Sequence, residues 1–259
     1  MIKHLASHPR VETKRVKPEW LYTTRRYPLY WHHIPKNGGT FFKSLLYYLD
    51  NERLIDPETG RHDWDDQLER ASQTSLEEIE RNAHNLIIMR NPIHRFLSVY
   101  FDKVYHGGGP RRPGMSREFF AAHDLREDKN LSAAGHTENC LKLAQWAASN
   151  IAGETRTKPN WHLVPQTHQL TQVFKSNFHV LTLEGFRWQL VHFLKDLVPD
   201  IEKASHAVGA RNKSPKPIRK SDILTPELTQ RLKEIYADDF RSFRQVRRYW
   251  RELRQRELS

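Results

Sequence analysis

The chain has 259 residues, with 42 Lys and Arg against 31 Asp and Glu, a formal net charge of +11, and 37% hydrophobic residues that include seven Trp and twelve Phe. A chain of this length can bury a full core, which excludes a small protein stapled by disulfides or metal, and its aromatic content excludes a disordered chain. The single cysteine, Cys140, excludes a disulfide framework. The positive charge favours an anionic partner such as a nucleotide, a nucleic acid or an acidic polysaccharide.

The N-terminal segment is polar. Residues 1–20 are charged throughout and contain no apolar stretch long enough for a signal peptide. Later apolar runs such as Leu86–Met89 fall far short of the roughly 20 residues that a transmembrane helix needs. We therefore expect a soluble, cytoplasmic protein, with a removed native leader left open. Residues 1–26 are expected to form a basic lead-in, and residues 27–259 a single domain.

The first predicted elements are a strand, a loop and a helix. Tyr27–Ile34 (YPLYWHHI) is rich in aromatic residues and predicts a strand. Apolar residues recur at helical spacing from Phe41 to Leu49, and Thr40 stands where an N-cap would lie. The capping-box spacing at the start of Ser75–Arg81 predicts a further short helix.

The same unit then repeats. Asn85–Met89 (NLIIM) predicts a strand, because its continuous apolar run is typical of a strand buried on both faces of a parallel sheet. Pro92 is well placed as the first residue of a helix that continues to Val104. Helical patterns resume over Ser116–Asp128 and Thr137–Asn150.

The C-terminal part continues the alternation. His179–Leu183 predicts a strand, and a helix is expected over about Arg187–Leu197. A basic, proline-containing loop covers Ala210–Ser221, and Thr225–Arg256 predicts one or two amphipathic helices rich in arginine. Alternating strands and helices predict an α/β fold with a parallel sheet.

The loop after the first strand has the chemistry of an anion site. Gly38 and Gly39 let the backbone approach a ligand, the following helix supplies free N–H groups and a positive dipole end, and Thr40 adds a hydroxyl. Taken alone, the glycine pair fits an ordinary strand-to-helix turn as well. The loop therefore admits phosphate or sulfate without proving either.

Comparison with nucleotide hydrolases indicates which kind of phosphate ligand the loop would bind. In their P-loop a lysine follows the last glycine, and a second strand ends in an aspartate that helps to hold magnesium. Here Lys36 precedes the glycines, and Arg90 follows the second strand. The pattern favours a nucleotide whose phosphates are met directly by two cations and by backbone N–H groups, without magnesium.

Two motifs together resemble those of the carbohydrate sulfotransferases. HIPKNGGTFFKSLL (His33–Leu46) looks like the family's 5′-phosphosulfate-binding loop, and RNPIHRFLSVY (Arg90–Tyr100) looks like its 3′-phosphate-binding segment. The resemblance is strong over residues 27–106 and thin afterwards. It implies a P-loop-like three-layer α/β fold, with a central, mostly parallel sheet flanked by helices.

The resemblance also implies an activity and its ligands. The donor would be 3′-phosphoadenosine 5′-phosphosulfate (PAPS), the product 3′-phosphoadenosine 5′-phosphate (PAP), and the reaction a metal-independent sulfuryl transfer to a hydroxyl. The acceptor would be a saccharide or glycoconjugate, for which the basic chain favours an anionic one. Nucleic acid is not an expected partner.

Site residues follow from the resemblance, position by position. Lys36 would contact the bridging oxygen and the sulfate of the donor, while Arg90 and Ser98 would hold the 3′-phosphate. The residues that would cradle the 5′-phosphate are Asn37, Gly38, Gly39 and Thr40, and Pro35 and Phe41 are further cofactor-binding candidates. Many relatives have Thr or Ser in place of Asn37 and Asp in place of Asn91. Arg95 is left out of the site, because an arginine one turn into a helix is more often a surface or ion-pair residue.

The late basic loop adds two further candidates. Arg211 and Ser214 lie where sulfotransferases often close over the adenosine and the 3′-phosphate. A charge run of this kind fits a solvated surface equally well. The role of the arginines near the C-terminus is also left open. They fit either the binding of an anionic acceptor or the solvent-exposed face of an amphipathic helix. These residues are Arg241, Arg244, Arg247, Arg248 and Arg251.

Sulfuryl transfer needs a base at the attacking hydroxyl and a cation at the leaving oxygen. In the family a histidine that follows a glycine, between the two motifs, often serves as the base, and His62 fits that position. Lys36 would stabilise the leaving oxygen. His162 and Gln166 belong to a Trp-His and Pro-Gln run similar to one near the family's acceptor, so we expect them to bind acceptor, with His162 as the second candidate for the base. His33 is expected to pack at the strand end.

Two other functions fit the sequence less well. A magnesium-dependent P-loop kinase or nucleotide hydrolase would need a Walker lysine and a metal-binding carboxylate, and neither can be placed. A nucleic-acid-binding module would use the net charge, but the basic residues are spread along the chain and no reading motif is present.

Overall fold

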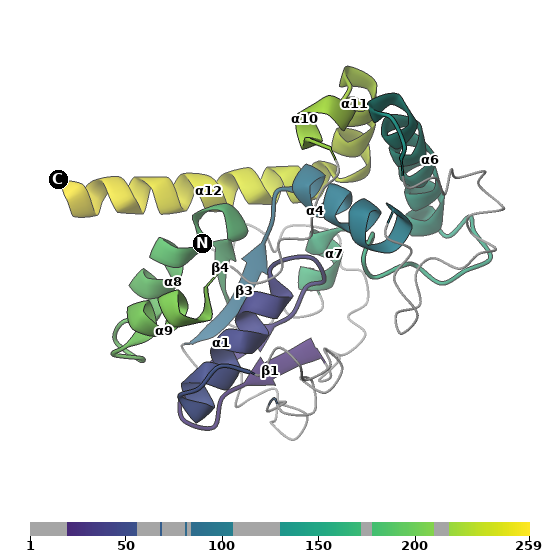
Figure 1. Ribbon diagram of the computed structural model, residues 1–259. Coiled ribbons are helices and arrows are strands. Elements are labelled where there is room, and N and C mark those ends of the chain that lie inside the picture. The colour runs from purple at the N-terminus through teal and green to yellow at the C-terminus, as the bar shows by residue number, and fades with distance from the viewer. Residues whose placement is uncertain are drawn as a thin grey trace. The chain divides into compact units, whose positions relative to one another are not determined.

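The computed structural model describes residues 20–55, 68, 81, 84–105, 130–171, 178–209 and 218–259. It is a mixed α/β structure whose strands and helices alternate along the chain (Figure 1). The helix expected over Ser116–Asp128 lies outside the described residues, as does the one over Ser75–Arg81 apart from its last residue. The chain divides into two compact units: Met1–Arg90 with Gln166–Lys213 and Ser242–Ser259, and Asn91–Pro165 with Ser214–Arg241.

The first unit contains a four-stranded sheet with the order β1-β2-β3-β4. Its strands are β1 (Leu21–Thr23), β2 (Tyr30–His32), β3 (Asn85–Met89) and β4 (Phe178–Thr182). β1 pairs antiparallel with β2, whereas β2, β3 and β4 are parallel, with Tyr30 opposite Asn85 and Asn85 opposite Phe178. The carboxyl ends of the three parallel strands therefore meet at one edge of the sheet, and the predicted α/β class is confirmed.

The strand boundaries refine the expectations from sequence. All five residues of β3 are buried, which explains its uninterrupted apolar run. Leu21–Thr23 was expected in the basic lead-in and instead forms β1; that expectation was wrong because three residues are too short to show a periodic pattern. β2 is likewise shorter than the aromatic run around it.

Helix α1 (Gly39–Asn51) follows the loop after β2 and buries Phe42, Leu45 and Leu49 in the core shared with the sheet. The expected N-cap, Thr40, is wrong by two residues. Gly38 takes that position with φ 84°, a left-handed conformation in which glycine is unstrained, so the chain enters the helix earlier. Because glycine has no side chain, the N-cap position provides no side-chain hydrogen bond to the first-turn N–H groups of α1.

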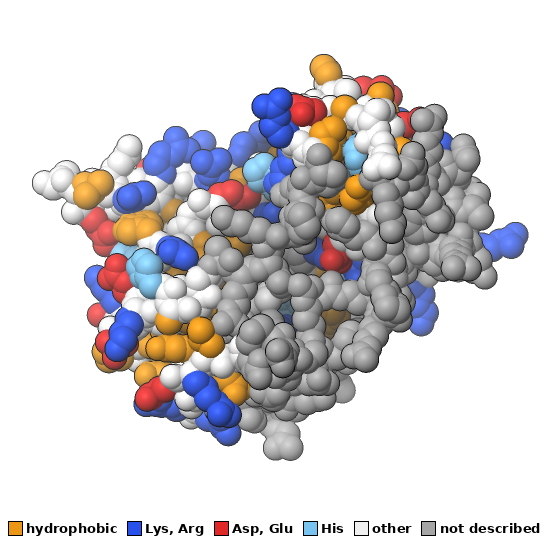
Figure 2. Space-filling model, in the orientation of Figure 1, with side chains coloured by type: hydrophobic (Ala, Val, Ile, Leu, Met, Phe, Trp, Pro, Cys, Tyr) orange, Lys and Arg blue, Asp and Glu red, His pale blue; other side chains and the backbone are white. Residues whose placement is uncertain are grey.

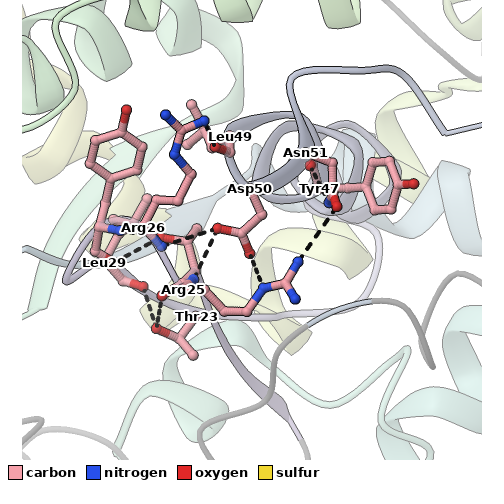
Figure 3. Close-up of polar contacts among 10 residues, drawn as sticks. Thr23, Arg25, Arg26, Leu29, Tyr47, Leu49, Asp50 and Asn51 are labelled. Carbon is pink, nitrogen blue, oxygen red and sulfur yellow. Dashed lines mark hydrogen bonds and ion pairs between the residues drawn. The ribbon is translucent and has the colours of Figure 1, made fainter.

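A polar cluster holds the other end of α1 (Figure 3). Asp50 Oδ1 accepts the backbone N–H groups of Arg25 at 2.9 Å and Arg26 at 3.2 Å. Its second oxygen lies 3.8 Å from the Arg25 guanidinium, and Arg26 forms an ion pair with Glu52. The turn after β1 is thereby fastened to the last turn of α1, which fixes the direction in which the helix N-terminus points.

Other helices complete the first unit: α7 (Gln166–Thr171), α8 (Phe186–Leu194), α9 (Ile201–Val208) and residues 242–258 of α12 (Ala237–Leu258). α9 packs on α1, and α8 on β4. The Trp250 indole N–H of α12 donates to the Val180 carbonyl of β4 at 2.8 Å. Because β4 is an edge strand of the described sheet, this bond covers an edge carbonyl.

The second unit is helical: α4 (Pro92–Val99), the π-helix η4 (Tyr100–Tyr105), α6 (Ala133–Ala152), α10 (Lys220–Ile223) and α11 (Pro226–Ile235). Pro92 begins α4 as expected, but the helix changes to π geometry at Tyr100 instead of continuing regularly to Val104. Asn91 caps α4 by accepting the N–H groups of Ile93 at 3.0 Å and His94 at 3.4 Å. Asn is among the preferred N-cap residues, so Asn91 suits the start of α4. Among the described helices, none is long and apolar enough to cross a membrane.

Candidate functional site

The loop between β2 and α1 has an unusual backbone. Lys36 has φ 69° and Gly38 has φ 84°, so two of its residues are left-handed. For a lysine this conformation is uncommon and costs free energy unless neighbouring contacts impose it. The Asn37 N–H donates to the Ile34 carbonyl at 3.2 Å, which closes the turn. The loop therefore brings Lys36 to the N-terminus of α1 in a tightly bent backbone.

A side chain on either glycine of the loop would come too close to a neighbouring side chain. A Cβ at Gly38 would lie 2.8 Å from Leu183 Cδ1, and one at Gly39 would lie 2.5 Å from His33 Nε2. His33 also packs against Trp20 and Trp31, with ring centroids 5.4 and 5.1 Å away. The sequence-based reading of His33 as a packing residue agrees with these contacts, which hold its ring against the loop.

Arg90 meets this loop, as the parallel pairing of β2 and β3 requires. It follows β3 directly, and its Nη1 donates to the Lys36 carbonyl at 2.8 Å. A guanidinium carries five N–H donors, so this bond is compatible with an additional phosphate contact. The two cations that the sequence singled out thus lie at one edge of the sheet.

Asn37 and Gln166 join the loop to β3 through their amides. Asn37 is 1% exposed, and its Nδ2 donates to the Ile88 carbonyl at 2.7 Å and to Gln166 Oε1 at 2.6 Å. Gln166 Oε1 also accepts the Arg90 N–H at 2.9 Å, and its Nε2 donates to the Arg90 carbonyl at 2.9 Å. The sequence placed Gln166 at the acceptor, and nothing in the motif indicated these contacts because they join residues far apart in the chain.

In the second unit, Arg95 is buried and bonded to backbone carbonyls. It is 2% exposed, and its guanidinium donates to the Val164 carbonyl at 2.9 Å and the Trp161 carbonyl at 3.2 Å. Burial lowers its pKa, and the nearby Asp239 carboxylate opposes that shift. Arg95 is therefore a buried support for the turn at 161–164. Of the two environments expected for it, surface or ion pair, the surface position was wrong, and the Asp239 carboxylate lies near enough to oppose the effect of burial on its pKa.

His162 lies on that supported turn. Its N–H donates to Asn160 Oδ1 at 3.0 Å, and the buried Tyr236 hydroxyl donates to the adjacent Leu163 carbonyl at 3.0 Å. Burial raises the pKa of Tyr236, which keeps this phenol protonated as a donor. Ser98 is also in the second unit, half-buried on α4.

Three predicted site residues, His62, Arg211 and Ser214, lie outside the described residues. Within the described ranges, no group of three or more His, Cys, Asp or Glu side chains is arranged to hold a metal ion. Pro35, Thr40 and Phe41, which the sequence also assigned to the site, lie in the loop or the first turn of α1.

A family model described as "Sulfotransferase family" matches residues 20–244, which is most of the chain. The chain belongs to the sulfotransferase family. A comparison with curated proteins and one with solved structures found no match. As a sulfotransferase, the protein is an enzyme that moves a sulfuryl group from a nucleotide sulfate donor to an acceptor. The family resemblance read from the two motifs is thereby confirmed.

Gly38 allows a direct test of the loop geometry. We expect Gly38→Ala to lower the free energy of unfolding by about 1–2 kcal/mol for the left-handed backbone, plus about 0.5–1.5 kcal/mol for displacing the Leu183 side chain. Gly153 is the matched control, because its φ of 78° is also left-handed but nothing lies within 4 Å of an added Cβ. Urea unfolding would measure both variants. An equal loss in the two would contradict the packing argument.

Proposed function

We propose that this sulfotransferase transfers the sulfuryl group of PAPS to a hydroxyl of a saccharide or glycoconjugate. The observation that carries the proposal is the meeting of Lys36 and Arg90 beside two glycines, at the edge where parallel strands end and α1 begins. Glycines, a helix N-terminus and two cations are suited to a dianionic phosphate group and a sulfate. PAPS supplies both.

The proposed reaction is an in-line displacement. The acceptor oxygen attacks sulfur, the bond from sulfur to the bridging oxygen breaks, and PAP leaves with the bonding electron pair. Lys36 stabilises the negative charge that develops on the leaving oxygen, while a base takes the proton of the acceptor hydroxyl. Arg90 and Ser98 hold the 3′-phosphate, and the loop around Gly38 and Gly39 holds the 5′-phosphate.

The arrangement at the end of β3 supports metal-independent binding. In magnesium-dependent P-loop enzymes the residue near this position is an acid that helps to hold the ion. Here Arg90 occupies this position, and its guanidinium donates a hydrogen bond to the Lys36 carbonyl in the loop. A cation at this place neutralises phosphate directly and does not attract magnesium.

His62 is the proposed base, with His162 the alternative. The support for His62 is its place in the sequence between the two motifs. The support for His162 is the rigid turn on which it lies, held by buried Arg95 and Tyr236. A base must be held where the acceptor hydroxyl arrives, and a fixed turn meets that need.

An anionic acceptor is favoured by the solvent-facing side of α12. Figure 2 shows Lys and Arg side chains gathered along this helix. Arg244, Arg248 and Arg251 recur at spacings of four and three residues and are exposed, while Phe243 and Trp250 are buried. Among the described residues, no carboxylate forms an ion pair with any of these three arginines. The helix thus presents a fixed row of positive charge that complements a polyanion.

The donor is tested by calorimetric titration with PAP. We expect PAP to bind the protein in the presence of EDTA, and magnesium-ATP to bind at least about 10-fold more weakly, because the site has cations in place of a metal-binding acid. ATP titrated with magnesium is the comparison. Binding of magnesium-ATP alone would overturn the proposed donor and favour a kinase.

The base is tested with His62→Ala and His162→Ala. We expect His62→Ala to reduce turnover of PAPS by about 100-fold or more while PAP affinity changes little, because a base acts only on the acceptor proton. His162→Ala should raise the KM for the acceptor with a smaller effect on kcat. Sulfate transfer from radiolabelled PAPS to a panel of polysaccharides would measure both. The reverse pattern would assign the base to His162.

The row on α12 is tested with the triple variant Arg244→Gln, Arg248→Gln, Arg251→Gln. We expect about a 10-fold higher KM for a sulfated polysaccharide, since three exposed ion pairs contribute a few tenths of a kcal/mol each, and a weaker dependence of KM on salt. The KM for a neutral saccharide should not change. A matched control removes three exposed cations elsewhere in the first unit: Arg187→Gln, Lys195→Gln, Lys203→Gln. Equal effects of the two triple variants would contradict a docking role for α12.

A further inference from the structure

The side chain of Gln166 pairs with the backbone N–H and carbonyl of one residue, as a neighbouring strand would. Its Nε2 donates to the Arg90 carbonyl at 2.9 Å, and its Oε1 accepts the Arg90 N–H at 2.9 Å. Both polar backbone groups of one residue are thereby bound by one side-chain amide. Because Arg90 is the first residue after β3, this pairing extends the order of the sheet one residue beyond Met89.

The same amide orients Asn37. The backbone N–H and carbonyl of Arg90 determine which end of the Gln166 amide is the oxygen. The same oxygen, Oε1, faces Asn37, so Asn37 must present its NH₂ group to it. The Ile88 carbonyl, at 2.7 Å from Asn37 Nδ2, demands the same orientation. Among the described residues, Oδ1 of Asn37 is left without a donor, so the amide keeps this orientation at the cost of one buried acceptor.

These contacts lie on both sides of Lys36. Asn37 is its neighbour in the chain and is tied to β3, and Arg90 Nη1 donates to the Lys36 carbonyl at 2.8 Å. Lys36 itself is left-handed, with φ 69°, a conformation that surrounding contacts must impose. Gln166 is 0% exposed and touches both of the residues that impose it.

We propose that Gln166 is a positioning residue for the donor site: its amide locks Asn37 and Arg90 together, and so holds Lys36 and the loop in the geometry that accepts the donor. The inference rests on the proposed function for the identity of the donor. It assigns Gln166 to the nucleotide side of the reaction and not to the acceptor, where its motif had placed it. Gln166 acts through Asn37 and Arg90 and need not touch either substrate.

The test measures PAP affinity by calorimetry in the wild-type protein and two variants. Gln166→Met keeps the length of the side chain and removes every hydrogen bond, and we expect PAP affinity to fall about 10-fold or more. Gln166→Glu keeps the two accepting contacts and loses the donating one, so we expect an intermediate loss. The acceptor KM should stay unchanged in both variants. Should Gln166→Met fold poorly, Gln166→Glu carries the test.

Gln189→Met is the matched control for a purely structural effect. Gln189 is also buried, and its amide ties the end of β4 through the Thr182 N–H at 2.7 Å and the Thr182 hydroxyl at 2.9 Å. We expect it to lower the melting temperature by an amount similar to Gln166→Met, with PAP affinity retained. Equal losses of PAP affinity in the two variants would overturn the proposal.

The outcomes separate this inference from the function on which it rests. Unchanged PAP affinity in Gln166→Met, or a raised acceptor KM with PAP affinity intact, overturns the positioning role and leaves the donor assignment standing. Failure of the wild-type protein to bind PAP overturns both. A non-additive loss in the double variant Asn37→Ala, Gln166→Met would support the coupling of the two amides.

Discussion

The parallel pairing of β2 with β3 is the constraint on which the candidate site depends. It brings the residues that follow the two strands to the same edge, so that Arg90 reaches the Lys36 carbonyl although 54 positions separate them. β4, parallel to β3, adds Leu183 at that edge, where it packs against Gly38. A loop that starts on one strand is therefore shaped by contacts from the next two.

That constraint explains how a strained loop persists. A left-handed lysine is unfavourable by itself, and a glycine in the same loop adds conformational freedom in the unfolded chain. Buried hydrogen bonds from Asn37 and Arg90 offset these costs, because each would leave an unsatisfied polar group if the loop relaxed. The Asp50 cluster at the far end of α1 holds the helix against the turn after β1. Order at the loop thus comes from both ends of α1.

In the second unit, buried side chains hold a turn in place by hydrogen bonds to its backbone. A buried guanidinium and a buried phenol, Arg95 and Tyr236, hold the turn that carries His162 through backbone carbonyls. Both side chains donate to backbone carbonyls of the same turn. Replacing Arg95 would remove two hydrogen bonds from the turn that carries His162, so Arg95 supports the fold of this segment.

The sequence by itself determined the family, the α/β alternation and the loop. Leu86–Met89 is apolar throughout because β3 is buried on both faces, and the glycine pair that begins α1 is visible in the sequence, whereas the side chains of Leu183 and His33 that crowd it are not. The assignments of His62, Arg211, Ser214 and a cytoplasmic location stay predictions. Only the tertiary structure decided the N-cap of α1, the burial of Arg95 and the partners of Gln166. These depend on contacts between segments up to 129 positions apart, as between Asn37 and Gln166, and local patterns of periodicity or capping contain no information about such pairs.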